Sequence, residues 1–181
     1  MPHTLIVGSS GTGKSSLAKR LAETRVKTRK YVGAFSQVAL DPLGSVWPDG
    51  VLVVNDFDAL TMELEIMHEA GEVGCVYVDE ANTQFAHGDK EKLWLMLRGR
   101  HFGFDITCIT QYPTLLSPAA RGQCERLHVF QIGAQSARML AEDYACPQIT
   151  QASGLKRGEW LAVEWEQGTR VANKYVLFDS A

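Results

Sequence analysis

The sequence contains no long apolar run. Within its 181 residues, no uninterrupted apolar stretch approaches the roughly 20 residues that a membrane-spanning helix requires. We therefore expect no membrane-spanning segment. The opening residues Met1, Pro2 and His3 lead directly into an apolar strand pattern, and not into a signal peptide. Both absences favour a protein that works inside the cell.

Paired cysteine motifs are absent as well. The four cysteines, Cys75, Cys108, Cys124 and Cys146, show no C-x-x-C spacing. Cys75 and Cys108 lie inside apolar strand-like runs, where buried and reduced thiols are expected, as in a cytoplasmic protein. Neither the cysteines nor the five histidines show the spacing of metal ligands.

The sequence also lacks a basic excess, because 18 Lys and Arg residues stand against 21 Asp and Glu residues, for a formal net charge of −3. The chain therefore has no global positive field that would attract nucleic acid. Any contact with DNA must come from local loops or from a ring of subunits. The basic segment 25–30 could contact DNA phosphates and segment 87–92 could form a pore-facing loop, but solvent-exposed connectors explain both at least as well.

Apolar strand-like runs alternate with helical patterns, which predicts a three-layer α/β fold with a mainly parallel sheet. The predicted strands are 4–8, 31–38, 51–55, 74–79, 105–110 and 127–132, and the predicted helices are 13–25, a segment around 60–67, 89–100 and 134–144. Segments 159–165 and 170–178 flank a turn at 166–169 and predict an antiparallel hairpin at the sheet edge. Without repeats or a dividing linker, we expect one domain over 1–181, with a core at about 4–145 and a hairpin extension at about 159–178.

The most informative segment is an octapeptide that matches the Walker A pattern G-x-x-x-x-G-K-[ST], between an apolar strand and a helical pattern. Its residues are Gly8, Ser9, Ser10, Gly11, Thr12, Gly13, Lys14 and Ser15, and we add Ser16 to the expected nucleotide contacts. The glycines let successive N–H groups point at a polyphosphate. Lys14 is expected to reach the β- and γ-phosphates and the Ser15 hydroxyl to ligate Mg²⁺. The sequence therefore predicts a site for ATP and Mg²⁺.

An acidic pair follows the apolar run 74–78. Asp79 is expected to hold Mg²⁺ through its water shell, and Glu80 to polarise a water for attack on the γ-phosphate. A kinase for a small molecule must exclude water and has no use for such a glutamate. Gln111, at the end of the predicted strand 105–110, is expected to contact the γ-phosphate or the attacking water.

Two arginines, Arg98 and Arg100, stand at the end of the predicted helix 89–100. One interpretation is that they interact with the negative end of that helix, an effect of about 0.3–1 kcal/mol. The other is an arginine finger that a subunit supplies to its neighbour's nucleotide, an effect of roughly 10³–10⁵ in rate.

Together these segments resemble the FtsK–HerA superfamily of ATPases, and in particular the genome-packaging ATPases of tailless icosahedral viruses with internal membranes. The resemblance spans about residues 4–132 and implies a RecA-like P-loop NTPase core. By position the resemblance gives the Walker roles to Lys14, Ser15, Asp79 and Glu80, and the sensor role to Gln111. It gives the role of the trans-acting finger to Arg100, with Arg98 as the second candidate.

The resemblance further implies a homo-oligomeric ring, typically a hexamer, that pumps double-stranded DNA. Capsid or portal-vertex proteins would be its partners, in the host cytoplasm and at the packaging vertex of the virion. Other hypotheses are a small-metabolite kinase, a phage assembly or export ATPase, and an assembly factor that binds ATP with little turnover.

Overall fold

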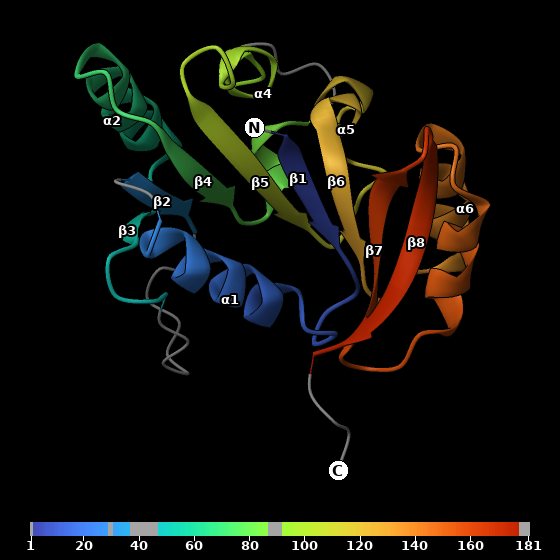
Figure 1. Ribbon diagram of the computed structural model, residues 1–181. Helices are drawn as coiled ribbons and strands as arrows, with labels where there is room; N and C mark the ends of the chain where they lie inside the picture. The colour runs from blue at the N-terminus through green and yellow to red at the C-terminus, as the bar shows by residue number, and fades with distance from the viewer. Residues whose placement is uncertain (1, 29–30, 37–46, 87–91, 178–181) are drawn as a thin grey trace.

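The computed structural model describes residues 2–28, 31–36, 47–86 and 92–177 (Figure 1). The strands are β1 (His3–Val7), β2 (Tyr31–Phe35), β3 (Leu52–Val54), β4 (Gly74–Val78), β5 (Phe104–Thr110), β6 (Cys124–Val129), β7 (Glu159–Glu166) and β8 (Thr169–Val176). The α-helices are α1 (Lys14–Val26), α2 (Phe57–Glu69), α3 (Ala81–Gln84), α4 (Trp94–Arg98), α5 (Pro118–Gln123) and α6 (Ala134–Asp143), and a 3-10 segment, η1, covers Pro147–Gly154.

All eight strands belong to one sheet in the order β3-β2-β4-β5-β1-β6-β7-β8. The first six strands in this order, β1 to β6 by number, pair in parallel, whereas β7 pairs antiparallel with β6 and with β8. The predicted hairpin at the sheet edge is therefore confirmed, and its two strands are Glu159–Glu166 and Thr169–Val176. Figure 1 shows this hairpin beside β6, at the opposite side of the sheet from β2 and β3.

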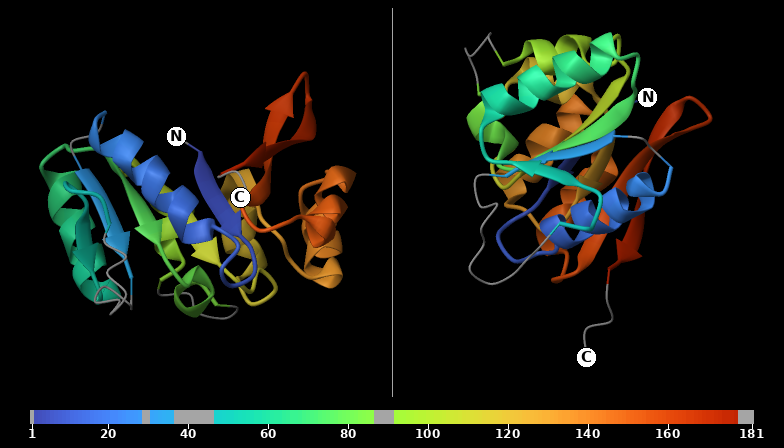
Figure 2. Two further views of the ribbon diagram at one scale, coloured as in Figure 1. Left: turned by 90° about the horizontal axis from the view of Figure 1, so that it is seen from below. Right: turned by 90° about the vertical axis from the view of Figure 1, so that its left-hand side faces the viewer.

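Helices cover both faces of the sheet, which confirms the three-layer prediction. One face packs against α1 through Leu17, Ala18 and Ala22, and the other packs against α2, α4, α5 and α6. The two views in Figure 2 show α1 on its own side of the sheet. Because neighbouring residues of a strand point to opposite faces, Leu5 and Val7 join one core and Ile6 joins the other.

The helix predicted over 89–100 differs from the structure. The described part of it, α4, is limited to Trp94–Arg98, and its buried residues are Leu95 and Met96. Leu97, which helical spacing places on the same side as Leu93 and Met96, is 47% exposed. In so short a helix the packing against the sheet decides which residues are buried, because there are too few turns for a 3.6-residue period to hold.

Some sequence predictions lie outside the described residues. These are positions 37–38 of the second predicted strand and position 178 of the hairpin. Positions 29–30 of the segment 25–30 and positions 87–91 of the segment 87–92 also lie outside them. Within the described ranges no helix is both long enough and apolar enough to cross a bilayer.

Candidate nucleotide-binding and hydrolysis site

The Walker A segment forms a loop that is tied to both neighbouring strands where β1 ends. The N–H of Gly8 donates to the carbonyl of Thr110 at the end of β5, at 3.3 Å. The N–H of Ser9 donates to the carbonyl of Gln131, just after β6, at 2.8 Å. The loop is therefore held at the carboxyl edge of the parallel strands, the edge at which α/β folds bind their ligands.

Two glycines of the loop lie against the ring of Phe130. Gly13 has a φ of +118°, and a Cβ atom there would lie 2.9 Å from Cε1 of Phe130. A Cβ atom at Gly8 would lie 2.6 Å from Cβ of the same residue. Packing therefore requires glycine at both positions, and at Gly13 the backbone conformation requires it as well.

The first turn of α1 is open towards the loop. No side chain caps this helix, and its first turn contains no acidic residue. The side chains of Ser15 and Ser16 are exposed there. The unpaired N–H groups and the positive end of the helix dipole suit a polyphosphate. A hydroxyl and a carboxylate both offer the oxygen ligands that Mg²⁺ prefers, so the chemistry of Ser15 and Asp79 fits the metal that the sequence predicts.

Lys14 is buried beside the acidic pair, with only 8% of its surface exposed. Its Nζ atom donates to the carbonyl of Ser9 at 2.9 Å. Burial lowers the pKa of Lys14, and the nearby Asp79 and Glu80 carboxylates oppose that shift. The ammonium group therefore lies within electrostatic reach of both carboxylates, and a phosphate oxygen can take over the interaction that it now makes with Ser9.

The two consecutive carboxylates after β4 have different environments. Asp79 extends the strand pairing, since its N–H donates to the carbonyl of Phe35 at 2.9 Å. Burial raises the pKa of Asp79, and a hydrogen bond from the N–H of Glu80, at 3.0 Å, opposes that shift. Glu80 has a φ of +48° and a ψ of +42°. This left-handed conformation costs a residue other than glycine about 1–2 kcal/mol and turns the chain sharply at the strand end.

Gln111 meets this turn from the neighbouring strand. Its Nε2 atom donates to Oε1 of Glu80 at 3.2 Å. The contact arises because β5 lies between β4 and β1, so that the ends of these strands come together at one edge. The structure thus brings together Lys14, Asp79, Glu80 and Gln111.

Arg100 lies at the opposite end of the parallel strands, where they begin. It follows α4 and donates through Nη2 to the carbonyl of Gln123, the last residue of α5, at 2.6 Å. Its Nη1 atom pairs with the carboxylate of Glu125, near the start of β6. The amino ends of the parallel strands meet here, whereas the Walker A loop follows their carboxyl ends. Arg100 is therefore far from the phosphate loop of its own chain, and the helix end that it contacts is that of α5, not of α4.

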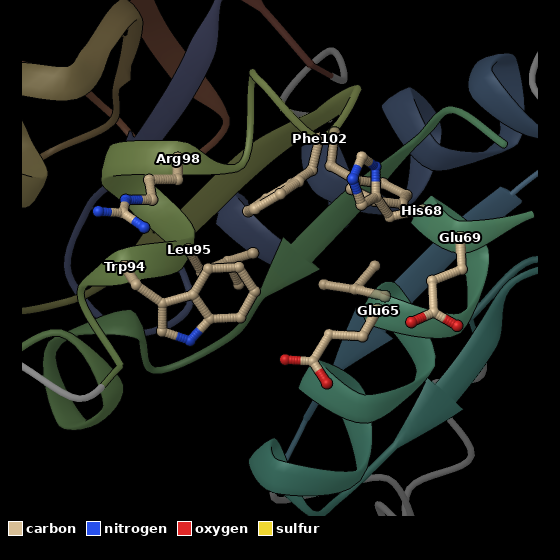
Figure 3. Close-up of a pocket in the computed structure, with 9 residues that line it drawn as sticks. Glu65, His68, Glu69, Trp94, Leu95, Arg98 and Phe102 are labelled. Carbon is tan, nitrogen blue, oxygen red and sulfur yellow. The ribbon is translucent and has the colours of Figure 1, made fainter. Parts of the chain in front are cut away.

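Arg98 is exposed and lines a pocket of about 250 Å³ between α2 and α4. Figure 3 shows Arg98 and Trp94 on one side of this pocket and Glu65 and Glu69 of α2 on the other. Trp94 packs at the edge of the core, with its ring 5.8 Å from that of Phe102. The pocket is also lined by Phe104, the first residue of β5, whereas the phosphate loop contacts Thr110, the last residue of that strand. The pocket and the phosphate loop are therefore separate.

The C-terminal hairpin packs against the phosphate loop, a contact that the sequence did not predict. The ring of Trp160 stacks between those of Phe130 and Tyr175, with centroid distances of 5.8 and 5.4 Å. The N–H of Gly158 donates to the carbonyl of Thr12 at 3.0 Å. No spacing rule identifies these contacts, because each depends on how separate segments pack, and Thr12 and Gly158 are 146 positions apart in the chain.

A phosphate loop after β1, an acidic pair after β4 and this strand order define the fold of a RecA-like P-loop NTPase. Solved structures with the same fold include the genome-packaging NTPase B204 of Sulfolobus turreted icosahedral virus 2 in complex with AMPPCP. The TM-score is 0.75 at 18% identity, over 97% of this chain and 98% of that one. This likeness agrees with the FtsK–HerA resemblance of the motifs.

Two further solved structures share the fold at lower similarity. The conjugation coupling protein TcpA of pCW3 gives a TM-score of 0.61 at 15% identity, over 98% of this chain and 61% of that one. The N-terminal domain of zonular occludens toxin from Neisseria meningitidis gives a TM-score of 0.50 at 17% identity, over 99% and 96% of the two chains. No protein-family model and no curated protein matches the sequence.

Proposed function

We propose that this protein is an ATP-driven translocase that packages double-stranded viral DNA into a preformed capsid. The observation that carries the proposal is the meeting of Lys14, Glu80 and Gln111 at one edge of the sheet, where Gln111 holds the carboxylate of Glu80. A fold shared with a viral genome-packaging NTPase over nearly the full length of both chains supports it.

The chemistry proposed is hydrolysis of the γ-phosphate. The phosphate loop and Lys14 bind the β- and γ-phosphates. Ser15 and Asp79 would hold Mg²⁺, which would supply positive charge at the phosphate oxygens. Glu80 accepts a proton from a water that attacks the γ-phosphorus in line, and the bond to the ADP oxygen breaks. A glutamate aimed at water suits hydrolysis and does not suit transfer to a small acceptor.

The proposed assembly is a homo-oligomeric ring, with a hexamer as the expected form, that acts in the host cytoplasm and at the packaging vertex with capsid or portal proteins. Charge limits how such a ring contacts DNA. Residues 47–86 contain Asp and Glu but no Lys or Arg, and α2 exposes Asp58, Glu65 and Glu69. The exposed face of α2 therefore repels DNA phosphates, so the DNA path in the proposed ring lies along other elements.

The experiment that tests the proposal is an ATPase assay of the assembled protein with double-stranded DNA across a salt series. We expect DNA to stimulate phosphate release at low salt and the stimulation to fall as salt rises, because the contacts are made to phosphates. The Lys14→Ala variant controls for contaminating ATPases. A rate that is indifferent to DNA at low salt, or phosphoryl transfer to a small acceptor, contradicts the proposal.

A further inference from the structure

A buried hydrogen bond joins the two turns that carry Glu80 and Gln111. Thr110 Oγ1 donates to Oδ1 of Asn82 at 2.6 Å. Thr110 ends β5 directly before Gln111, and Asn82 stands two residues after Glu80 in α3. Both side chains are buried, with 1% of Thr110 and 8% of Asn82 exposed. The contact is therefore shielded from water, where a polar group that loses its partner is not rescued by solvent.

Thr110 connects this bond to the rest of the site. Its hydroxyl oxygen also accepts the N–H of Tyr112 at 3.0 Å, so the same side chain fixes the backbone on both sides of Gln111. Its carbonyl accepts the N–H of Gly8, the first residue of the phosphate loop, at 3.3 Å. One residue thus contacts the loop, the turn of Gln111 and the turn of Glu80.

Glu80 has few constraints of its own on the position of its carboxylate. Its backbone is in a left-handed conformation, and among the described residues its carboxylate accepts one hydrogen bond, that of 3.2 Å from Gln111. The bond between Thr110 and Asn82 lies beside this contact and connects the same two turns. Two parallel links fix the separation of the turns, which one long side-chain contact does not do.

We propose that Asn82 and Thr110 are positioning residues that hold Glu80 and Gln111 in the geometry needed for hydrolysis. The inference rests on the proposed role of Glu80. Neither residue contacts the nucleotide in this scheme, and both act through the turns that they join. Small displacements of a catalytic group lower the rate strongly, whereas the phosphate loop continues to bind. Loss of the bond should therefore reduce kcat far more than affinity.

The test compares Thr110→Val, which removes the hydroxyl and keeps the shape, with Thr110→Ser, which keeps the hydroxyl. We expect Thr110→Val to lower the single-turnover rate of ATP hydrolysis by about 10- to 100-fold, with a nucleotide Kd within about twofold of the wild type. Thr110→Ser should retain most of the rate. Thr107→Val is the matched control, because Thr107 is a buried threonine of the same strand.

A double-mutant cycle separates this role from a general loss of stability. If the two residues act through their mutual bond, Asn82→Ala combined with Thr110→Val should be no slower than the slower single variant. Thermal unfolding of each variant identifies any that fail to fold. Thr110→Ser still decides the question when a single variant is unstable, because its rate shows whether the site requires the hydroxyl.

Four results overturn the proposal. They are an unchanged rate in folded Thr110→Val, an equal loss in Thr107→Val, no recovery in Thr110→Ser, and additive effects in the cycle. Glu80→Gln distinguishes this failure from failure of the proposed function. If Glu80→Gln is slow and Thr110→Val is not, only the positioning role is wrong. If Glu80→Gln is as fast as the wild type, both proposals are wrong.

Discussion

Arg100 and Glu125 form an ion pair within one chain, at the edge of the sheet opposite the phosphate loop. The pair is partly exposed, with 31% of the Arg100 side chain and 48% of the Glu125 side chain accessible. Exposed ion pairs contribute about 0–1 kcal/mol, so Arg100 can leave Glu125 for a phosphate at little cost. The arrangement agrees with a finger that acts on a neighbouring subunit and excludes one that acts on its own nucleotide.

The first prediction concerns this arginine. Arg100→Ala should lower turnover by roughly 10³-fold with nucleotide affinity kept, because the guanidinium acts on charge that develops in the transition state. Glu80→Gln supplies a finger without a working site, and Arg100→Ala supplies a site without a finger. Mixed oligomers of the two should therefore recover hydrolysis, measured as phosphate release. Arg98→Ala is the control, and it should behave as the wild type.

Full activity of dilute, monomeric Arg100→Ala would contradict this role. So would the absence of any recovery in oligomers that are shown to be mixed. Either result would leave Arg100 as a residue that caps α5 and pairs with Glu125.

The second prediction separates binding from hydrolysis in the phosphate site. Lys14→Ala should lose most nucleotide affinity, since the β- and γ-phosphates lose their ammonium partner. Glu80→Gln should bind Mg-ATP with near-normal affinity and hydrolyse it slowly. Titration with a fluorescent nucleotide and a phosphate-release assay measure the two effects. An equal loss of affinity in both variants would show that the assigned roles are wrong.

The third prediction is a loss of stability in mild acid. Burial lowers the pKa of His3 to about 4 and the pKa of His128 to about 4, with Arg100 and Arg126 adding to the respective shifts. The unfolded chain takes up protons on these rings near pH 6.5, before the folded chain does. Stability contributed by the neutral rings is therefore complete above pH 6.5 and is lost as pH falls towards 4, by on the order of 3 kcal/mol for each ring.

His3 gives a structural reason for this shift. Its Nδ1 atom accepts the N–H of Ile106 at 2.9 Å, so a proton on that nitrogen would face another donor. Denaturant unfolding at several pH values measures the slope of stability with pH. His128→Gln should reduce the slope by about half, and an unchanged slope in that variant would rule out its contribution.

The fourth prediction concerns the hairpin. Trp160→Leu should weaken nucleotide binding, because the indole supports Phe130, which packs against Gly8 and Gly13 of the loop. Trp165→Leu is the matched control on the same strand, where the side chain is 59% exposed. Isothermal titration with a non-hydrolysable ATP analogue measures both. Similar Kd values for the two variants would show that the stack does not support the loop.

The parts of the site that sequence predicts are those in which function sets a local pattern. Lys14 and Ser15 follow from a spacing within one loop, and Asp79 and Glu80 from an apolar strand that ends in acids. The order of the strands in the sheet then determines that Gln111 meets Glu80.

The parts that sequence does not predict depend on packing between distant segments. Thr110 reads as an ordinary strand threonine until Asn82 is found opposite it. Helical spacing does not predict that α4 buries Leu95 with Met96, because the sheet beneath this five-residue helix selects them. One interpretation of Arg100 was a contact with the end of its own helix, but the helix end that it contacts in space is that of α5.

The contact between Gly158 and Thr12 joins residues that the ribosome makes far apart in time. The phosphate loop leaves the ribosome before Trp160, which stacks on Phe130 behind the loop, and before Leu177, which packs at Gly13. Forming contacts of such long sequence separation carries a large loop-closure cost. A nascent chain thus carries the complete Walker A sequence before it has the packing that shapes the loop. That packing is complete only when β7 and β8 have joined the sheet.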